Sequence, residues 1–411
     1  MSRVAPRPGT RAVAIGMVAT TLGILPAYLT AGMAVFLRDD LDFSRSALGL
    51  AMSVFFLVSA LGSVPAGRFA EARGTRLTLA SSALIAGVSL GGIALARTWP
   101  QLLAALVIGG MANAMTAPAS NRYLVDRVRL DRRGLAMAIK QTSFPLATFG
   151  SGLAVPVIGL TIGWRWAFVL ASVVAVAACV HFTTRIPPDP ERTPTGTNGP
   201  AAAGTARGDE GAPTRPEPDQ PMWILVVLAF GASLGTAAGS SLASFYVEST
   251  VDGGLAAGAA GVGLAAGSLF GVLARLSFGA AADRMTATLR FRHVAGLFVI
   301  GGVGMLGFAG PSTNLVLLLV TTALAFGAGW GWHGLFHLAI VQASPSAPAA
   351  STGVVMVGLF LGGIYGPAAF GFIADTVSFA ASWTFLSISL LCGAVILAVV
   401  DRRVRQHAPP T

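Results

Sequence analysis

Four polar side chains that could bind a ligand stand inside long apolar stretches of this sequence: Asn113, Lys140, Arg275 and His333. Lys140 is the only lysine of the chain, in which every other side chain of fixed positive charge is an arginine. No aspartate or glutamate occupies the middle of an apolar stretch. Because a guanidinium binds a carboxylate through two parallel hydrogen bonds, this set of residues suits an anion. We therefore predict a binding site for a small organic anion such as a carboxylate.

Further residues could line the same site. Gln141 directly follows the lysine, and Tyr28 and Tyr365 stand close to proline or glycine in apolar stretches. Proline and glycine allow helices to bend, and a tyrosine places a hydroxyl on an apolar wall. Ordinary core packing is the alternative for both tyrosines, as it is for Trp330 and Trp332. For the lysine, the alternative is that its ammonium reaches toward the membrane interface.

Two histidines and one glutamate are candidates for carrying a proton. His333 and His337 are four residues apart, so they share one face of a helix, and histidine exchanges protons near neutral pH. Glu248 lies near the end of an apolar stretch. The histidines could instead be uncharged packing residues, and the glutamate could be an interfacial cap. We predict proton coupling and take protons as a partner of the chain.

The elements that position these residues are predicted to be membrane-spanning helices. The chain is 54% hydrophobic and only 11% charged, and its mean hydropathy is +0.73. Spanning a bilayer takes roughly 20 helical residues, because hydrocarbon cannot satisfy exposed backbone groups. The fold class is therefore an all-α membrane protein, and the predicted spans are 12–36, 46–66, 77–96, 101–120, 135–158, 166–183, 222–246, 255–278, 294–310, 315–340, 351–373 and 384–400.

The arginines predict how these spans are oriented. If the N-terminus is cytoplasmic, the outer loops hold only Arg38, Arg45, Arg97 and Arg165, and the other loop arginines lie inside. This asymmetry obeys the positive-inside rule, so the net charge of +10 indicates orientation and not nucleic-acid binding. We expect a multi-pass protein of the cell (inner) membrane with both termini cytoplasmic, and no cleaved signal peptide at its basic start.

A change in composition divides the chain. Residues 187–221 are rich in proline, glycine, threonine and charge, and such a segment cannot bury enough apolar area to fold. We predict an N-terminal six-helix bundle over 1–183, a disordered cytoplasmic linker over 184–221, and a C-terminal six-helix bundle over 222–411.

Two loops repeat one pattern in the two halves. The first reads GRFAEARGTR from Gly67, and the second reads GAAADR from Gly279. Each has a carboxylate four residues after its glycine, namely Glu71 and Asp283, and each follows one apolar helix and precedes the next. This duplication predicts a transporter built from two repeats.

The chain resembles the major facilitator superfamily, whose signature is Gly-x-x-x-Asp-Arg-x-Gly-Arg-Arg between helices 2 and 3. It departs from that pattern where Glu71 replaces the aspartate and Ala72 replaces a basic residue. The resemblance implies two bundles that rock about a central site, alternately open to each side. It also implies that the helices carrying the four polar residues face the central cavity, and that the substrate is a small molecule.

The repeated loops predict a gate. A carboxylate just past a helix end can bind a neighbouring helix N-terminus or an arginine, and such a contact exists only while that side of the protein is closed. We expect the two glycines to permit close packing or a tight turn. The predicted gating residues are Gly67, Glu71, Arg73, Gly74, Arg76, Gly279, Asp283 and Arg284.

Other functions remain open at this stage. A proton-driven multidrug or metabolite efflux antiporter is the first alternative, although cationic drugs usually require a membrane carboxylate. A non-transporting membrane sensor or scaffold is the second. We expect no enzyme activity, no catalytic residue, no cofactor, no metal site, contact with membrane lipid, and a monomer.

Overall fold

The computed structural model describes residues 8–129, 132–187, 219–284, 291–310 and 314–406, and in these ranges the chain forms helices and no strand. The linker prediction falls almost entirely on residues outside these ranges and stays a prediction. The helices are α1 (Pro8–Gly32), α2 (Ala34–Leu41), α3 (Arg45–Leu95), α4 (Trp99–Arg127), α5 (Arg133–Gln141), α6 (Ser143–Ala154), the π-helical turn η2 (Val155–Gly159), α7 (Trp164–Arg185), α8 (Met222–Asp252), α9 (Ala257–Arg284), α10 (Phe291–Gly307), α11 (Leu315–Gly327), α12 (His333–Ala343), α13 (Pro348–Thr376) and α14 (Phe379–Gln406).

The helices have the lengths and surfaces of a membrane protein. Nine helical segments of the described chain are long and apolar enough to cross a bilayer, and α10 and α11 are shorter apolar helices. Many large apolar side chains are exposed, among them Leu61 at 71% and Val316 at 72%. Apolar surface on this scale fits lipid better than water. The prediction of an all-α membrane fold is confirmed.

A kink at Gly74 marks where two predicted spans meet within α3. This helix is 51 residues long, and Gly74 has φ 83°, a conformation that glycine adopts without the steric cost other residues meet. By contrast, a Cβ added at Gly67 or Gly279 would meet no heavy atom within 4 Å. The expectation of close packing or a tight turn at these two glycines concerns a state in which this end of the protein is closed, and it stays a prediction; within α3 the turn lies at Gly74.

One predicted span, 315–340, is broken in the middle. Helix α11 ends at Gly327 and α12 begins at His333, with turns between them. Glycine permits this break, because a Cβ at Gly331 would overlap the carbonyl oxygen of Gly327. Non-helical backbone inside a membrane must be buried in protein or line a cavity. The sequence predicted one continuous helix here, and that was wrong.

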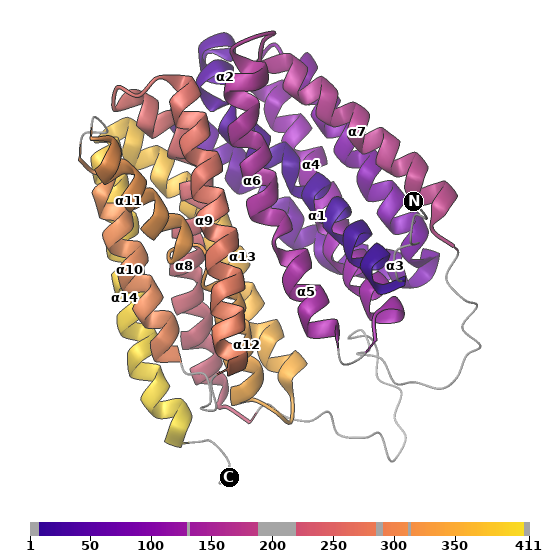
Figure 1. The fold of residues 1–411 in the computed structure, drawn as a ribbon, viewed down its shortest axis with the longest axis vertical. Coiled ribbons are helices and arrows are strands. Elements are labelled where there is room, and N and C mark those ends of the chain that lie inside the picture. The colour runs from indigo at the N-terminus through magenta and orange to yellow at the C-terminus, as the bar shows by residue number, and fades with distance from the viewer. Residues whose placement is uncertain (1–7, 130–131, 188–218, 285–290, 311–313, 407–411) are drawn as a thin grey trace, which may run out of the picture.

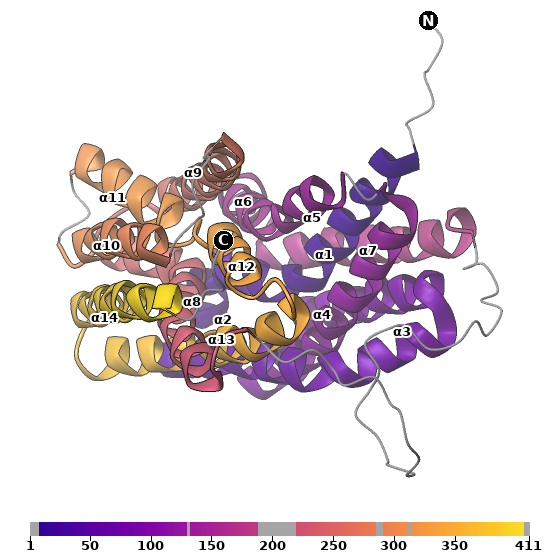
Figure 2. The ribbon, with the colours of Figure 1, turned by 90° about the horizontal axis from the view of Figure 1, so that it is seen from below.

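The helices form two bundles that meet along paired helices. Figure 1 shows α1 to α7 on one side and α8 to α14 on the other, and Figure 2 shows the same division from below. Helix α3 packs on α13, α6 packs on α9, and α1 packs on α8. We call the end of the molecule that carries α2 the α2 end, and the opposite end, which carries α5 and α12, the α12 end (Figure 1).

Backbones of the two bundles touch near the α2 end. A Cβ at Gly49 of α3 would overlap the carbonyl oxygen of Pro367 in α13, and a Cβ at Gly152 of α6 would lie 2.6 Å from the carbonyl oxygen of Gly261 in α9. The backbone N–H of Ala368 also donates to the hydroxyl oxygen of Ser53 at 3.1 Å, again between α13 and α3. The α2 end is therefore closed in this conformation.

Within the C-terminal bundle, three glycines of α13 let it lie directly on α8. A Cβ at Gly358 would overlap the carbonyl oxygen of Ala229, and a Cβ at Gly362 would overlap that of Ser233. Gly366, four residues further along α13, packs against Ala237 in the same way. Small residues spaced by four allow this close approach of membrane helices.

We expect the Gly362→Ala substitution to lower the melting temperature of the purified protein in detergent. The added methyl group forces α13 away from α8, and overpacking of this kind costs roughly 1–3 kcal/mol. The matched control is Gly353→Ala in the same helix, where a Cβ would meet no heavy atom within 4 Å. Equal melting temperatures for the two variants would show that the contact does not limit stability.

Candidate functional site

The break between α11 and α12 exposes a backbone carbonyl that organises the candidate site. Arg275 of α9 donates from one terminal nitrogen to the carbonyl oxygen of Trp330 at 3.0 Å. Its other terminal nitrogen donates to the carbonyl oxygen of Gln141 in α5, also at 3.0 Å. Since α9 and α5 belong to different bundles, the guanidinium bridges the interface between them.

His333 lies beside this arginine. Its Nδ1 is 3.1 Å from the same Trp330 carbonyl oxygen, and its ring stacks on Trp332 with centroids 4.1 Å apart. A carbonyl oxygen only accepts, so Nδ1 carries the hydrogen of this bond. The Nε2 atom is then the nitrogen that accepts a proton when the ring becomes charged.

Tyr28 of α1 completes the group from the other bundle. Its ring meets the ring of Trp330 edge to face, with centroids 6.0 Å apart, and its side chain is buried. Tyr28, Arg275 and His333 therefore contact Trp330, and Gln141 joins them through its carbonyl bond to Arg275; we call these five residues the Trp330 cluster. The structure brings together four predicted site residues around a tryptophan that the sequence left undecided between lining and filling.

Glycines of α8 make room for the indoles at the break. A Cβ at Gly239 would lie 2.5 Å from the ring of Trp330, and a Cβ at Gly235 would lie 2.8 Å from the ring of Trp332. The signal for this site in the sequence is the alternation of glycine and tryptophan from Gly329 to Trp332, which interrupts an otherwise regular apolar helix.

Lys140 is held inside the N-terminal bundle. It is 4% exposed, and its Nζ donates to the side-chain oxygen of Asn121 in α4 at 2.6 Å. Asn113 donates instead to the hydroxyl oxygen of Ser59, at 3.0 Å. Asn113 and Asn121 are eight residues apart, about 12 Å along the helix. The lysine therefore pairs with Asn121, a residue that the sequence analysis did not select. The side chain of Asn113 instead contacts α3.

Tyr365 of α13 makes no contact with the Trp330 cluster in the described part of the chain, and His337 of α12 reaches the cluster only through the backbone of His333. Tyr365 is partly buried. The Nδ1 of His337 donates to the carbonyl oxygen of His333 at 2.8 Å, and its Nε2 lies 3.4 Å from the sulfur of Met356. Both side chains belong to the C-terminal bundle, so a ligand that they contact would lie against that bundle.

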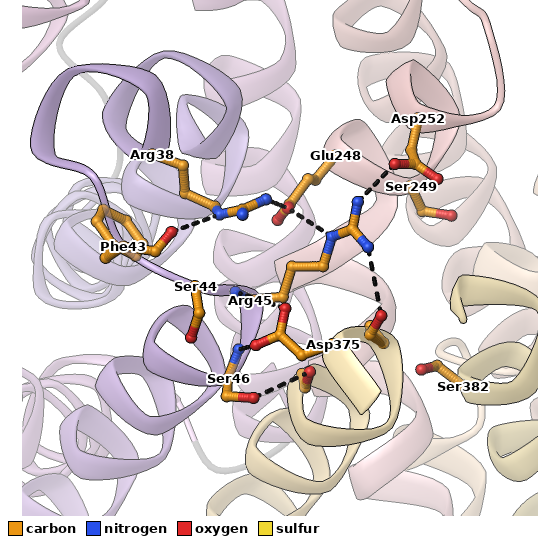
Figure 3. Close-up of polar contacts among 12 residues, drawn as sticks. Arg38, Phe43, Ser44, Arg45, Ser46, Glu248, Ser249, Asp252, Asp375 and Ser382 are labelled. Carbon is orange, nitrogen blue, oxygen red and sulfur yellow. Dashed lines mark hydrogen bonds and ion pairs between the residues drawn. The ribbon is translucent and has the colours of Figure 1, made fainter. Parts of the chain in front are cut away.

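Glu248 lies at the α2 end and pairs with two arginines of the other bundle. Its Oε1 contacts Arg38 of α2, and the Nε of Arg45 of α3 lies 3.5 Å away (Figure 3). Glu248 is nine residues from Gly239, which packs on Trp330, and this is about 14 Å along α8. The glutamate is thus part of the closed end and does not join the Trp330 cluster.

The predicted gating loops lie away from these contacts. Glu71 and Arg73 are exposed, and the nearby Arg122 of α4 donates to the carbonyl oxygen of Ala70 at 2.8 Å. The side chains of Asp283 and Arg284 lie outside the described part of the chain. The gating role of Glu71, Arg73, Gly74, Arg76, Asp283 and Arg284 stays a prediction. Among the described residues, no three histidine, cysteine, aspartate or glutamate side chains gather in a way that could hold a metal ion.

Two helical bundles that meet around a discontinuous helix and a half-buried polar cluster are the arrangement expected of a membrane transport protein. Residues 13–356 match the Major Facilitator Superfamily, and the chain belongs to that family. It is therefore a multi-pass membrane transporter and not an enzyme.

Known proteins resemble the chain along most of its length. An Agrobacterium vitis protein named "Putative tartrate transporter" is 25% identical over 396 residues, which are 91% of this chain and 89% of that protein. An "MFS-type efflux pump" of Mycolicibacterium smegmatis is 26% identical over 340 residues, 80% of this chain and 76% of the pump. A crystal structure of a bacterial homolog of the human lysosomal transporter Spinster superposes with a TM-score of 0.70 at 16% identity, covering 98% of this chain and 97% of that one. The last likeness concerns the fold alone.

We expect Asn121→Ala to destabilise the protein through Lys140. Removing the acceptor leaves a buried ammonium without this hydrogen bond, at a cost of roughly 1–3 kcal/mol. The control is a double-mutant cycle with Lys140→Met, measured as melting temperatures in detergent. If the pair is coupled, the double variant loses less stability than the two single losses added together; simple additivity would refute the coupling.

Proposed function

We propose that this chain transports a small organic anion, a carboxylate, by alternating access of two rocking bundles, and that proton movement drives the transport. One observation carries this proposal: the guanidinium of Arg275 lies at the interface of the two bundles, beside His333 and the break between α11 and α12. A substrate held there contacts both bundles, so its binding can influence how they move.

The hydrogen bonds of Arg275 support an anionic substrate. The guanidinium has five N–H donors, and the structure gives two of its nitrogens only neutral carbonyl acceptors. Its Nε is buried without a partner, and no aspartate or glutamate contacts it among the described residues. The side chain as a whole is half-buried, and a cation in such a partly desolvated position is stabilised by an opposite charge. A substrate carboxylate supplies that charge and fits the planar guanidinium in bidentate fashion.

The names of two relatives support the same substrate class. Besides the tartrate-named protein, a "Hexuronate transporter" of Bacillus subtilis (strain 168) is 24% identical over 160 residues, 39% of this chain and 38% of that protein. Tartrate and hexuronates are hydroxylated carboxylates.

The position of His333 supports proton coupling. It shares the Trp330 carbonyl with Arg275, so a proton on its Nε2 and a carboxylate on the arginine attract each other. A bound anion therefore favours the charged imidazole, and the charged imidazole favours the anion. In this scheme His337 and Glu248 are further proton-carrying candidates, and Asn113, Lys140 and Tyr365 are further substrate contacts.

The arginine asymmetry of the loops supports an orientation for this cycle. It assigns the α2 end to the outside of the inner membrane and both termini to the cytoplasm. With the α2 end closed by contacts between the bundles, the described conformation corresponds to the inward-facing state of the cycle. The predicted gate of the repeated loops would then close the opposite, cytoplasmic side in the outward-facing state.

An efflux pump is the second candidate, and the M. smegmatis relative favours it. The two functions differ in the direction of net movement and in the substrate. An exporter of apolar drugs has no need of Arg275, because such substrates lack the negative charge that binds a guanidinium. The role of this arginine therefore separates the candidates.

We expect tartrate uptake into proteoliposomes, driven by an inward proton gradient, to require Arg275. Removing one partner of a buried charge pair costs roughly 2–5 kcal/mol, so Arg275→Gln should lower uptake at subsaturating substrate about 30-fold or more. Arg275→Lys keeps the charge but loses the two-pronged geometry and should remain impaired. Arg165→Gln is the matched control, because Arg165 pairs with Asp40 within one bundle.

Three outcomes would contradict the proposal. Unchanged carboxylate uptake in Arg275→Gln would refute the site. Drug efflux in the absence of any carboxylate movement would favour the second candidate. Tight carboxylate binding without movement of any substrate would indicate a sensor.

A further inference from the structure

The carbonyl of Gln141 that Arg275 binds lies at a break between two helices. Helix α5 ends at Gln141 and α6 begins at Ser143, with Thr142 between them. Arg275 of α9, in the other bundle, donates to this carbonyl oxygen at 3.0 Å. Inside a regular helix a carbonyl accepts the N–H of the residue four positions later. The contact with Arg275 therefore needs a local cause.

Pro145 supplies this cause. It stands four positions after Gln141, and proline has no backbone N–H. The Gln141 carbonyl consequently lacks the donor that a regular helix would give it. The next carbonyl, that of Thr142, accepts the N–H of Leu146 at 3.0 Å in the regular manner. The helical pattern thus resumes one residue after the carbonyl that Arg275 binds.

The two carbonyls before Gln141 are bonded within their own bundle. That of Ile139 accepts the hydroxyl of Thr142 at 2.6 Å and the N–H of the same residue at 3.0 Å. That of Lys140 accepts the hydroxyl of Ser143 at 2.6 Å. Of these three successive carbonyls, the one that lacks a regular helical donor is the one that bonds across the interface.

The backbone at this break stays close to a helical path. Thr142 has φ −71° and ψ −7°, a right-handed helical conformation, and Pro145 is buried within α6. An N–H at position 145 would therefore point along the helix axis at the Gln141 carbonyl and draw it into line with that axis. Helix α9 lies to the side, since it packs on α6. A carbonyl drawn into line is a poorer acceptor for Arg275.

The second acceptor of Arg275 is also the product of a broken helix. The Trp330 carbonyl lies between α11 and α12, and in the described part of the chain no backbone N–H donates to it. The guanidinium is therefore held by two carbonyls, one from a break in each bundle. A proline leaves one carbonyl free, and glycine permits the break that leaves the other free.

The guanidinium has enough donors to keep both carbonyls while it binds a substrate. It carries five N–H groups, of which the two carbonyls take one each, and a bidentate carboxylate takes two more. The carbonyls therefore do not compete with the carboxylate but fix the plane of the guanidinium. A group that is already fixed binds at a lower cost in entropy than one that must be ordered during binding.

We propose that Pro145 is a positioning residue of the anion site: because it has no N–H, the Gln141 carbonyl stays free to hold Arg275 toward the substrate. Pro145 acts through this carbonyl and not by touching the ligand. Its role rests on the proposed function for the identity of the ligand, and it belongs to the described conformation, in which the α2 end is closed.

The test compares two replacements at position 145 that differ in one group. Pro145→Ala introduces a backbone N–H. Lactic acid, incorporated at the same position by nonsense suppression, has the same methyl side chain but an ester oxygen in place of the N–H. Both remove the proline ring, so a difference between them reports the hydrogen-bond donor. Equilibrium binding of radiolabelled tartrate is measured on the full-length protein in detergent.

We expect Pro145→Ala to bind tartrate about 10-fold more weakly than the wild type, the factor that corresponds to one hydrogen bond of a charged group. The lactic acid variant should retain the wild-type affinity. The half-buried guanidinium can take a water in place of the lost carbonyl, so it gains no attraction for the anion. Pro118→Ala is the matched control, because Pro118 lies inside α4, which makes no described contact with Arg275.

A second measurement needs no ligand. Melting temperatures without tartrate are compared for alanine or lactic acid at position 145, each with Arg275 and with Arg275→Met. Methionine has no N–H to offer the Gln141 carbonyl. The N–H at position 145 should therefore raise the melting temperature more in the Arg275→Met background than in the presence of Arg275. Such non-additivity is expected if the two donors use one carbonyl.

Two outcomes would overturn the role of Pro145. The first is equal tartrate affinity of the alanine and lactic acid variants, which would exclude the N–H as the cause. The second is a cycle of melting temperatures that is additive. A wild-type protein that binds no tartrate would contradict the proposed substrate, and the cycle then decides the role of Pro145. The positioning residue and the proposed function can thus fail separately.

Discussion

The absence of water from the bilayer core is the constraint on which the whole structure depends. Every backbone group and every charge within the membrane must find a partner inside the protein, or remain as a site that needs one. Most of the chain meets this demand by forming long apolar helices. The exceptions are few, and they are where function is to be sought: a break in one helix, an arginine held by carbonyl oxygens, and a glutamate held by two arginines.

The two exceptional regions divide the work of a transporter between them. At the Trp330 cluster, a cation lies between the bundles with neutral acceptors only, and this arrangement suits a ligand of opposite charge. At the α2 end, opposite charges from the two bundles are already paired, and this arrangement suits a contact that forms and breaks. In the proposed function the same residue type, arginine, thus attracts a ligand in one place and joins two halves of the protein in the other.

Close contact between backbones holds each bundle together and joins the two bundles. Glycines let α13 lie on α8 inside the C-terminal bundle, and other glycines let α3 meet α13 between the bundles. The first kind of contact continues along several turns of two helices, whereas the second is concentrated near one end. This difference fits the proposed cycle, in which one bundle tilts against the other without losing its own packing.

The sequence by itself determined the membrane fold, the family and the kinds of chemistry available. Apolar stretches of about 20 residues can only become spanning helices in lipid, and a repeated loop pattern is visible without coordinates. Arg275 and His333 could be singled out because charge within an apolar stretch is costly wherever the helix lies. That argument is local, so the sequence suffices for it.

Only the tertiary structure decided which of these residues meet. It paired Lys140 with Asn121 and not Asn113, gathered Arg275 and His333 on the carbonyl of Trp330, and placed Glu248 between Arg38 and Arg45. Each of these contacts joins helices that are separate in the chain, and a rotation of one helix by a single residue, about 100°, would abolish it. The periodicity of a sequence shows which residues share one face of a helix. The packing of the other helices decides which residues that face contacts.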